Sequence, residues 1–124
     1  MLNDKNPRKY DLEDRTAIFG QEVIKFCQTL PVNTISKPII TQIIRSATSI
    51  GANYLEANGA SSKKDFLNKI FICKKESQET KHWLKMLVVC FPNKLDVINN
   101  LLGESQELSM IFHKISQSTR NGSV

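Results

Sequence analysis

The sequence predicts an all-α protein, an antiparallel up-down-up-down four-helix bundle that forms a single domain over residues 1–124. Three observations favour this fold. Apolar residues recur at helical spacing in four long segments, which is the pattern of amphipathic helices. Five Gly and four Pro residues are few for a chain of many short strands, and the segments lie between capping and turn residues. The connections are short, as they are between antiparallel neighbours in a bundle.

The first helix is expected to run from Asp11 to about Thr29. Asp11 can cap its N-terminus, and Pro31 ends it. Residues 1–10 are polar, and together with residues 117–124 they are expected to be flexible.

The second helix is expected to span about Pro38 to Asn58. Ser36 is a plausible N-cap, and Pro38 stands at the first helical position, where its missing N–H costs nothing. Gly51 inside this helix costs up to about 1 kcal/mol relative to Ala. We therefore expect another helix to approach closely at Gly51.

The third and fourth helices are separated by a proline. Ser61 or Ser62 should cap the third helix, with Asp65 completing a pattern that resembles a capping box, and the helix should reach about Cys90. The fourth helix is expected to begin at Asn93 or Asp96, and Gly103 weakens it.

Size and composition describe an ordinary soluble domain. The chain has 124 residues, 40% of them hydrophobic and 23% charged, which is enough for one core without metal or disulfide staples. The three cysteines lie in apolar contexts, and no CxxC pair exists, so we expect buried, reduced thiols: Cys27, Cys73 and Cys90. No segment has the length and hydropathy of a signal peptide or a membrane span, and a cytoplasmic protein is expected.

A polar stripe runs along the second and third helices. Ser46, Ser49, Asn53 and Glu56 recur at steps of three, four and three residues and share one helical face. Glu76 and Glu79 repeat this spacing on the third helix. We interpret the stripe as a buried hydrogen-bond network or a subunit interface, in which Arg15, Lys74 or Lys75 neutralises the glutamates. The other interpretation is that these residues line a functional site.

The third helix also concentrates positive charge. The formal net charge of the whole chain is +5. The interpretations are a solvated face paired with neighbouring acids or a surface for polyanions. Phe66, Phe71 and Trp83 are assigned to the core, so little base stacking or sequence-specific readout is expected. The lysines of this possible nucleic-acid contact are Lys63, Lys64, Lys69, Lys74, Lys75, Lys81 and Lys85.

No pattern indicates catalysis, a metal or a cofactor. Glu79 and His82 form one E-x-x-H motif, whereas a di-iron bundle uses two such motifs, and only His113 remains as a further histidine. The serines have no histidine at a suggestive spacing, and no phosphate-binding loop is present. We expect a protein that is not an enzyme.

Several motifs resemble the family of 23S ribosomal RNA intervening-sequence proteins. They are DLEDRTAIF from Asp11, QIIRSATSIGANYLEA from Gln42, SSKKDF from Ser61 and KKESQETKHWLKML from Lys74. His82 departs from the family pattern, which tends to have an aromatic residue there. The resemblance implies a four-helix bundle that forms homopentamers with a central channel and has no established enzymatic activity. It also implies a relation to accessory proteins of diversity-generating retroelements, which form basic pentameric barrels that bind a reverse transcriptase and nucleic acid.

The resemblance and the charge together predict the function. We expect a homo-oligomeric module, a pentamer by the resemblance, that binds RNA or a ribonucleoprotein partner through basic surface. The alternative is a protein–protein interaction scaffold that binds no nucleic acid.

Overall fold

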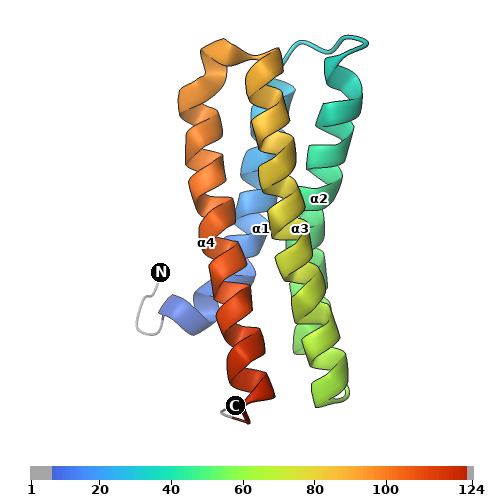
Figure 1. Cartoon of the computed structure of the whole chain (residues 1–124), viewed down its shortest axis with the longest axis vertical. Helices are drawn as coiled ribbons and strands as arrows, with labels where there is room; N and C mark the ends of the chain where they lie inside the picture. The colour runs from blue at the N-terminus through green and yellow to red at the C-terminus, as the bar shows by residue number, and fades with distance from the viewer. Residues whose placement is uncertain (1–6, 123–124) are drawn as a thin grey trace.

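Four long helices make up nearly all of residues 7–122, which are the residues that the computed structural model describes. Figure 1 shows the chain running along α1, back along α2, forward along α3 and back along α4. The predicted all-α, up-down-up-down bundle is therefore confirmed. The elements are α1 (Pro7–Gln28), α2 (Ser36–Asn58), α3 (Lys63–Cys90), the short 3-10 helix η1 (Pro92–Lys94) and α4 (Leu95–Arg120).

Both terminal helices are longer than expected. Helix α1 begins at Pro7, so Asp11 lies within it instead of capping it. Helix α4 continues to Arg120, so residues 117–120 are helical. Residues 7–10 and 117–120 are thus helical, where the sequence pattern predicted flexible segments. The rest of the predicted flexible arm, residues 1–6, and residues 123–124 lie outside the described residues.

Asn33, and not Ser36, caps the start of α2. The Asn33 side-chain oxygen accepts hydrogen bonds from the backbone N–H groups of Ile35 and Ser36, both at 2.9 Å. Ser36 is the first helical residue, and its hydroxyl donates to the carbonyl of Pro31 at 3.2 Å. An Asn side chain reaches a backbone N–H two or three residues ahead in a tight turn, which explains why the cap precedes the expected position.

Ser62 caps α3 as one of the two predicted residues. Its hydroxyl oxygen accepts a hydrogen bond from the Asp65 backbone N–H at 3.0 Å. The Asp65 carboxylate also lies in the first turn, where the helix dipole favours negative charge.

Helix α3 is central to the packing. It packs against both α2 and α4, and α2 also packs against α1, whereas α1 and α4 touch little. Two of the three predicted core thiols, Cys27 and Cys73, are buried, and burial raises their pKa from 9.0 to about 11 and about 12. Cys90 is only half-buried. The core is mostly apolar, and its fully buried large apolar side chains include Phe112, Ile43, Ile50, Ile70, Leu84, Leu87, Ile98 and Leu108.

Gly51 lies at a close approach of α1 and α2. A Cβ atom at this position would lie 3.3 Å from Thr16 Oγ1 and 3.4 Å from the Thr16 carbonyl carbon. The predicted close approach is confirmed, and the space taken by the α1 backbone explains glycine inside a helix.

Gly103 provides a control for the packing role of Gly51, because a Cβ atom at position 103 would meet nothing within 4 Å. Gly103→Ala should raise the free energy of unfolding by about 0.5–1 kcal/mol through helix propensity alone. Gly51→Leu should lower it, because the side chain would push α1 away from α2. Urea titrations followed by circular dichroism measure both variants. A stabilised Gly51→Leu protein would contradict the packing argument.

Candidate functional site

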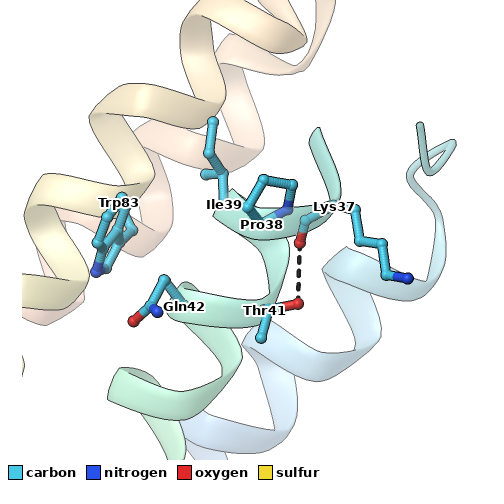
Figure 2. Close-up of a pocket in the computed structure, with 6 residues that line it drawn as sticks. All are labelled: Lys37, Pro38, Ile39, Thr41, Gln42 and Trp83. Atoms are coloured by element: carbon cyan, nitrogen blue, oxygen red, sulfur yellow. Dashed lines mark hydrogen bonds between the residues drawn. The ribbon is translucent and has the colours of Figure 1, made fainter. Parts of the chain in front are cut away.

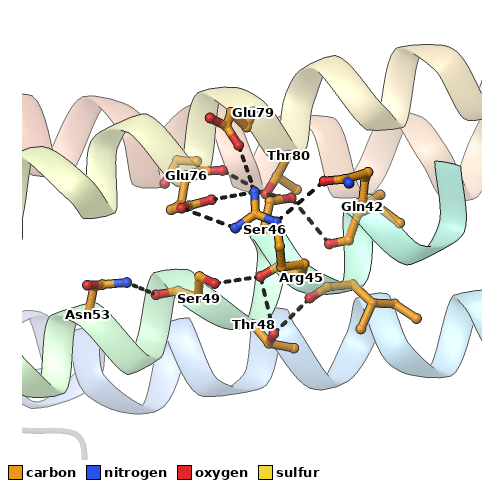
Figure 3. A network of polar contacts seen from close by, with 12 residues as sticks. Gln42, Arg45, Ser46, Thr48, Ser49, Asn53, Glu76, Glu79 and Thr80 are labelled. Atoms are coloured by element: carbon orange, nitrogen blue, oxygen red, sulfur yellow. Dashed lines mark hydrogen bonds and ion pairs between the residues drawn. The ribbon is translucent and has the colours of Figure 1, made fainter. Parts of the chain in front are cut away.

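An arginine of α2 binds two glutamates of α3 at the interface between these helices. The Arg45 guanidinium lies 3.3 Å from Glu76 Oε1 and 2.8 Å from Glu79 Oε1, as Figure 3 shows. The Glu76 side chain is only 8% exposed, so its charge needs a cationic partner at this depth. The hydrogen bond to Glu76 raises the pKa of Arg45 above its ordinary value. The predicted partners of these glutamates, Arg15, Lys74 and Lys75, are therefore wrong.

Small hydroxyl groups continue the network into the core. Thr80 Oγ1 donates to Ser46 Oγ at 2.9 Å, and both side chains are buried between α2 and α3. On the other side of α3, Ser105 Oγ donates to the Ser77 carbonyl at 2.7 Å and joins α3 to α4. These short side chains bond to one another and to a backbone carbonyl across the helix interfaces, and their small size leaves the helices close together.

The remaining stripe residues of α2 do not join the buried network. Ser49 Oγ donates to the Arg45 carbonyl at 2.6 Å, and Asn53 Nδ2 donates to the Ser49 carbonyl at 2.8 Å, so both bond to their own helix. Glu56 is exposed and pairs with Lys69 at 2.7 Å. Glu56 is therefore not part of a buried network within the chain, and the subunit-interface interpretation of the stripe stays a prediction. The four stripe residues share one face of α2, but this face is buried at Ser46 and exposed to solvent at Glu56.

Arg15 joins a different pair of helices. Its guanidinium binds Glu104 at 2.6 and 2.8 Å and Glu107 at 2.6 Å, across from α1 to α4. The bond to Glu104 raises the pKa of Arg15 above its usual range. This ion pair bridges two neighbouring helices whose backbones otherwise touch little. Arg15 is thus a structural link and no part of the α2–α3 network.

Arg45 could have been found from the symmetry of the α2–α3 hairpin. In an antiparallel pair, residues equally distant from the turn lie opposite each other. Arg45 stands fourteen residues before Gly59, and Glu76 stands fourteen residues after Ser62. Helical spacing within α2 alone cannot reveal this pairing, because it carries no information on what the neighbouring helix presents.

The predicted lysines fall into two groups. Lys69 turns towards α2 and pairs with Glu56. The other six form no ion pair with the described side chains of residues 12–122, and we call them the α3 basic surface. Among them, Lys74 Nζ lies 3.0 Å from His113 Nδ1 and Lys81 contacts Gln106, so these two reach α4. The α3 basic surface comprises Lys63, Lys64, Lys74, Lys75, Lys81 and Lys85.

Phe71 is exposed, where the sequence pattern assigned it to the core. The side chain is 39% exposed on the outward side of α3, and the Arg120 guanidinium carbon lies 4.8 Å from its ring centroid. Phe66 and Trp83, by contrast, pack partly buried against the core. Phe71 therefore places an aromatic ring within the α3 basic surface.

The acidic and metal-ligating side chains near the network form no cluster of their own. Among the side chains that the structure describes, residues 12–122, no three His, Cys, Asp or Glu come close enough to hold a metal ion. The carboxylates of α3 and α4 nearest the network are engaged by Arg45 and Arg15. No helix in the described part of the chain is long and apolar enough to cross a membrane.

Removing the Arg45 charge tests the network. Arg45→Met should lower the free energy of unfolding by about 1–3 kcal/mol, because Glu76 stays buried without its partner. Arg15→Met is the matched control and should cost about 0–1 kcal/mol, since its carboxylate partners are more exposed. Thermal and urea unfolding measure the difference. Equal losses in the two variants would contradict the special role of Glu76 burial.

Comparison with known proteins places the chain in a family. The family described as 23S rRNA-intervening sequence protein matches residues 8–114. A crystal structure of a protein with unknown function, from the S23 ribosomal protein family of Bacteroides thetaiotaomicron, is similar with 31% sequence identity and a TM-score of 0.77. The similarity covers 84% of this chain and 96% of that chain. No curated protein matched. The chain belongs to the 23S rRNA-intervening sequence protein family.

Proposed function

We propose that this protein is a non-enzymatic, homo-oligomeric helical-bundle module that binds RNA through the α3 basic surface. One observation carries the proposal: helix α3 holds seven lysines and three acidic residues, so it supplies +4 of the net charge of +5. Two of those acids, Glu76 and Glu79, are bound by Arg45 of the neighbouring helix. Asp65 is then the one acid of α3 that is left to offset the lysines of that helix.

A surface of this kind attracts the phosphate backbone. Unpaired lysines release counterions from a nucleic acid, and this release supplies affinity that is independent of sequence. Lys64, Lys75 and Lys85 are all exposed and recur along the outward side of α3. RNA is the polyanion that the family name suggests.

Self-association would multiply this modest surface. A groove of about 350 Å³ runs between α1 and α2, where small residues such as Gly20 and Ala52 lie beside apolar ones. Ile24 and Leu55 line it and are 36% and 55% exposed. Exposed apolar side chains beside small residues let a helix of another copy approach closely and bury them. Five copies is the number that the family resemblance implies.

The second candidate function is a protein-interaction scaffold without nucleic acid. It is favoured by an open hollow of about 510 Å³ between α2 and α3. Figure 2 shows Trp83 facing Ile39 and Gln42 there, with the Lys37 ammonium pointing away from the ring. A half-buried Trp beside an aliphatic side chain is typical of an anchor site for a protein partner. Co-purification of a partner protein with no nucleic acid would favour this function.

Binding to a structured RNA across a salt series tests the first function. The triple variant Lys64→Gln, Lys75→Gln, Lys85→Gln should lose affinity and flatten the dependence of log K on log salt, because phosphate contacts are lost. Lys25→Gln with Lys37→Gln, on α1 and α2, is the control and should bind like wild type. Filter binding gives both quantities. Affinity that ignores salt, or equal losses in triple variant and control, would contradict the proposal.

Light scattering coupled to gel filtration tests self-association. The wild-type mass should be a multiple of the 14.1 kDa chain. Ile24→Lys and Leu55→Lys should each reduce that mass, because a charge in the α1–α2 groove would be buried by the neighbouring copy. Ile35→Lys, an exposed position outside the groove, should leave it unchanged. A wild-type mass of one chain would rule out the oligomer.

A further inference from the structure

Phe71 is an exposed aromatic residue whose surroundings are cationic. It is 39% exposed. On the same side of α3, Lys64 lies two turns before it, and Lys74 and Lys75 lie one turn after it. Arg120, the last residue of α4, places its guanidinium over the ring at 4.8 Å. The lysines and arginine around the ring lack a carboxylate partner within the described residues.

The hydrophobic core does not account for the exposed part of this ring. The apolar core of the bundle is complete with side chains that are nearly fully buried on every helix, and Phe71 is not among them. A solvated lysine-rich face needs no aromatic residue for stability. Alternation of cations with an accessible aromatic ring is the arrangement by which proteins hold single-stranded nucleic acid.

The Phe71 ring and the Arg120 guanidinium are both planar groups on which a nucleobase can stack. Bases stack on aromatic rings and on guanidinium planes, and only unpaired bases can do so. Phosphates on either side of a stacked base would meet Lys64 on one side and Lys74 or Lys75 on the other. A duplex would reach the lysines but could not offer a base to the ring.

We propose that Phe71 and Arg120 form a stacking platform for an unpaired nucleobase, so that the ligand of the α3 basic surface is single-stranded RNA. This inference rests on the proposed RNA-binding function and specifies its substrate class. The lysines supply affinity for phosphate, and the platform discriminates single strands from duplexes.

The test compares an unstructured pyrimidine RNA with a blunt RNA duplex of the same length. Wild type should bind the single strand more tightly. Phe71→Leu should weaken single-strand binding on the order of tenfold and leave duplex binding unchanged. The salt slope should stay the same, because no phosphate contact is lost. Arg120→Lys keeps the positive charge and removes the planar guanidinium. It should therefore also weaken binding of the single strand, as Phe71→Leu does.

Two controls separate stacking from structure. Val89→Ala changes an apolar residue that is 80% exposed on the same helix, about 27 Å further along, and should alter neither ligand. Phe71→Trp should retain or improve single-strand binding. An oligothymidine arm shows whether the platform distinguishes RNA from DNA, and equal binding of both would assign the site to single strands in general, overturning the restriction to RNA.

Failure of the platform is distinct from failure of the function. If wild type binds neither RNA at low salt, the proposed function is wrong and the platform falls with it. If wild type binds RNA but Phe71→Leu binds the single strand as wild type does, or loses both ligands equally, the platform is wrong and ionic RNA binding stands.

Discussion

The ion pair between Arg45 and the buried Glu76 is the interaction on which the rest of the molecule depends. A carboxylate in the α2–α3 interface is tolerated only with a partner, and Arg45 supplies one from the opposite helix. The same guanidinium also binds Glu79. Two of the three acids of α3 are thus used to hold α2, which leaves the outward side of the helix with lysines. A packing requirement inside the bundle thereby sets the sign of the charge outside it.

The antiparallel register makes this arrangement possible. The Gly59–Ser62 turn places Arg45 opposite Glu76, Ser46 opposite Thr80, and Glu56 opposite Lys69. A helix shift by one turn would separate every one of these pairs while leaving the apolar faces able to pack. Hydrophobic burial therefore drives assembly of the helices, and the polar pairs select one alignment among several that burial alone would allow.

The sequence predicted most of the fold because each helix carries its own signals. Apolar periodicity, Ser62 at a cap, Pro92 at a break and Gly51 at a close approach are all local patterns. The helix ends were less predictable, since Asn33 caps α2 through a turn whose geometry is visible only in three dimensions. The site was predicted in part: the stripe identified Ser46, Glu76 and Glu79, but Arg45 belongs to it only through register. Phe71 was assigned to the core because helical spacing alone does not show whether an aromatic residue lies on the buried or the exposed face of a helix.

Helix α3 has two chemically different faces. On one face its charged side chains form ion pairs with α2, and on the other its lysines form no ion pair with the described side chains. Side chains directed at α2 are matched with opposite charges, and side chains directed outward or at α4 meet amides, a histidine or solvent. Ionic attraction alone would hold single-stranded and double-stranded RNA alike, because both present phosphates. In the proposed platform, a ring and a guanidinium plane among those cations would add a preference for unpaired bases that charge alone does not create. On the proposed platform, discrimination between nucleic-acid forms would therefore rest on two side chains that the core does not use, Phe71 and Arg120.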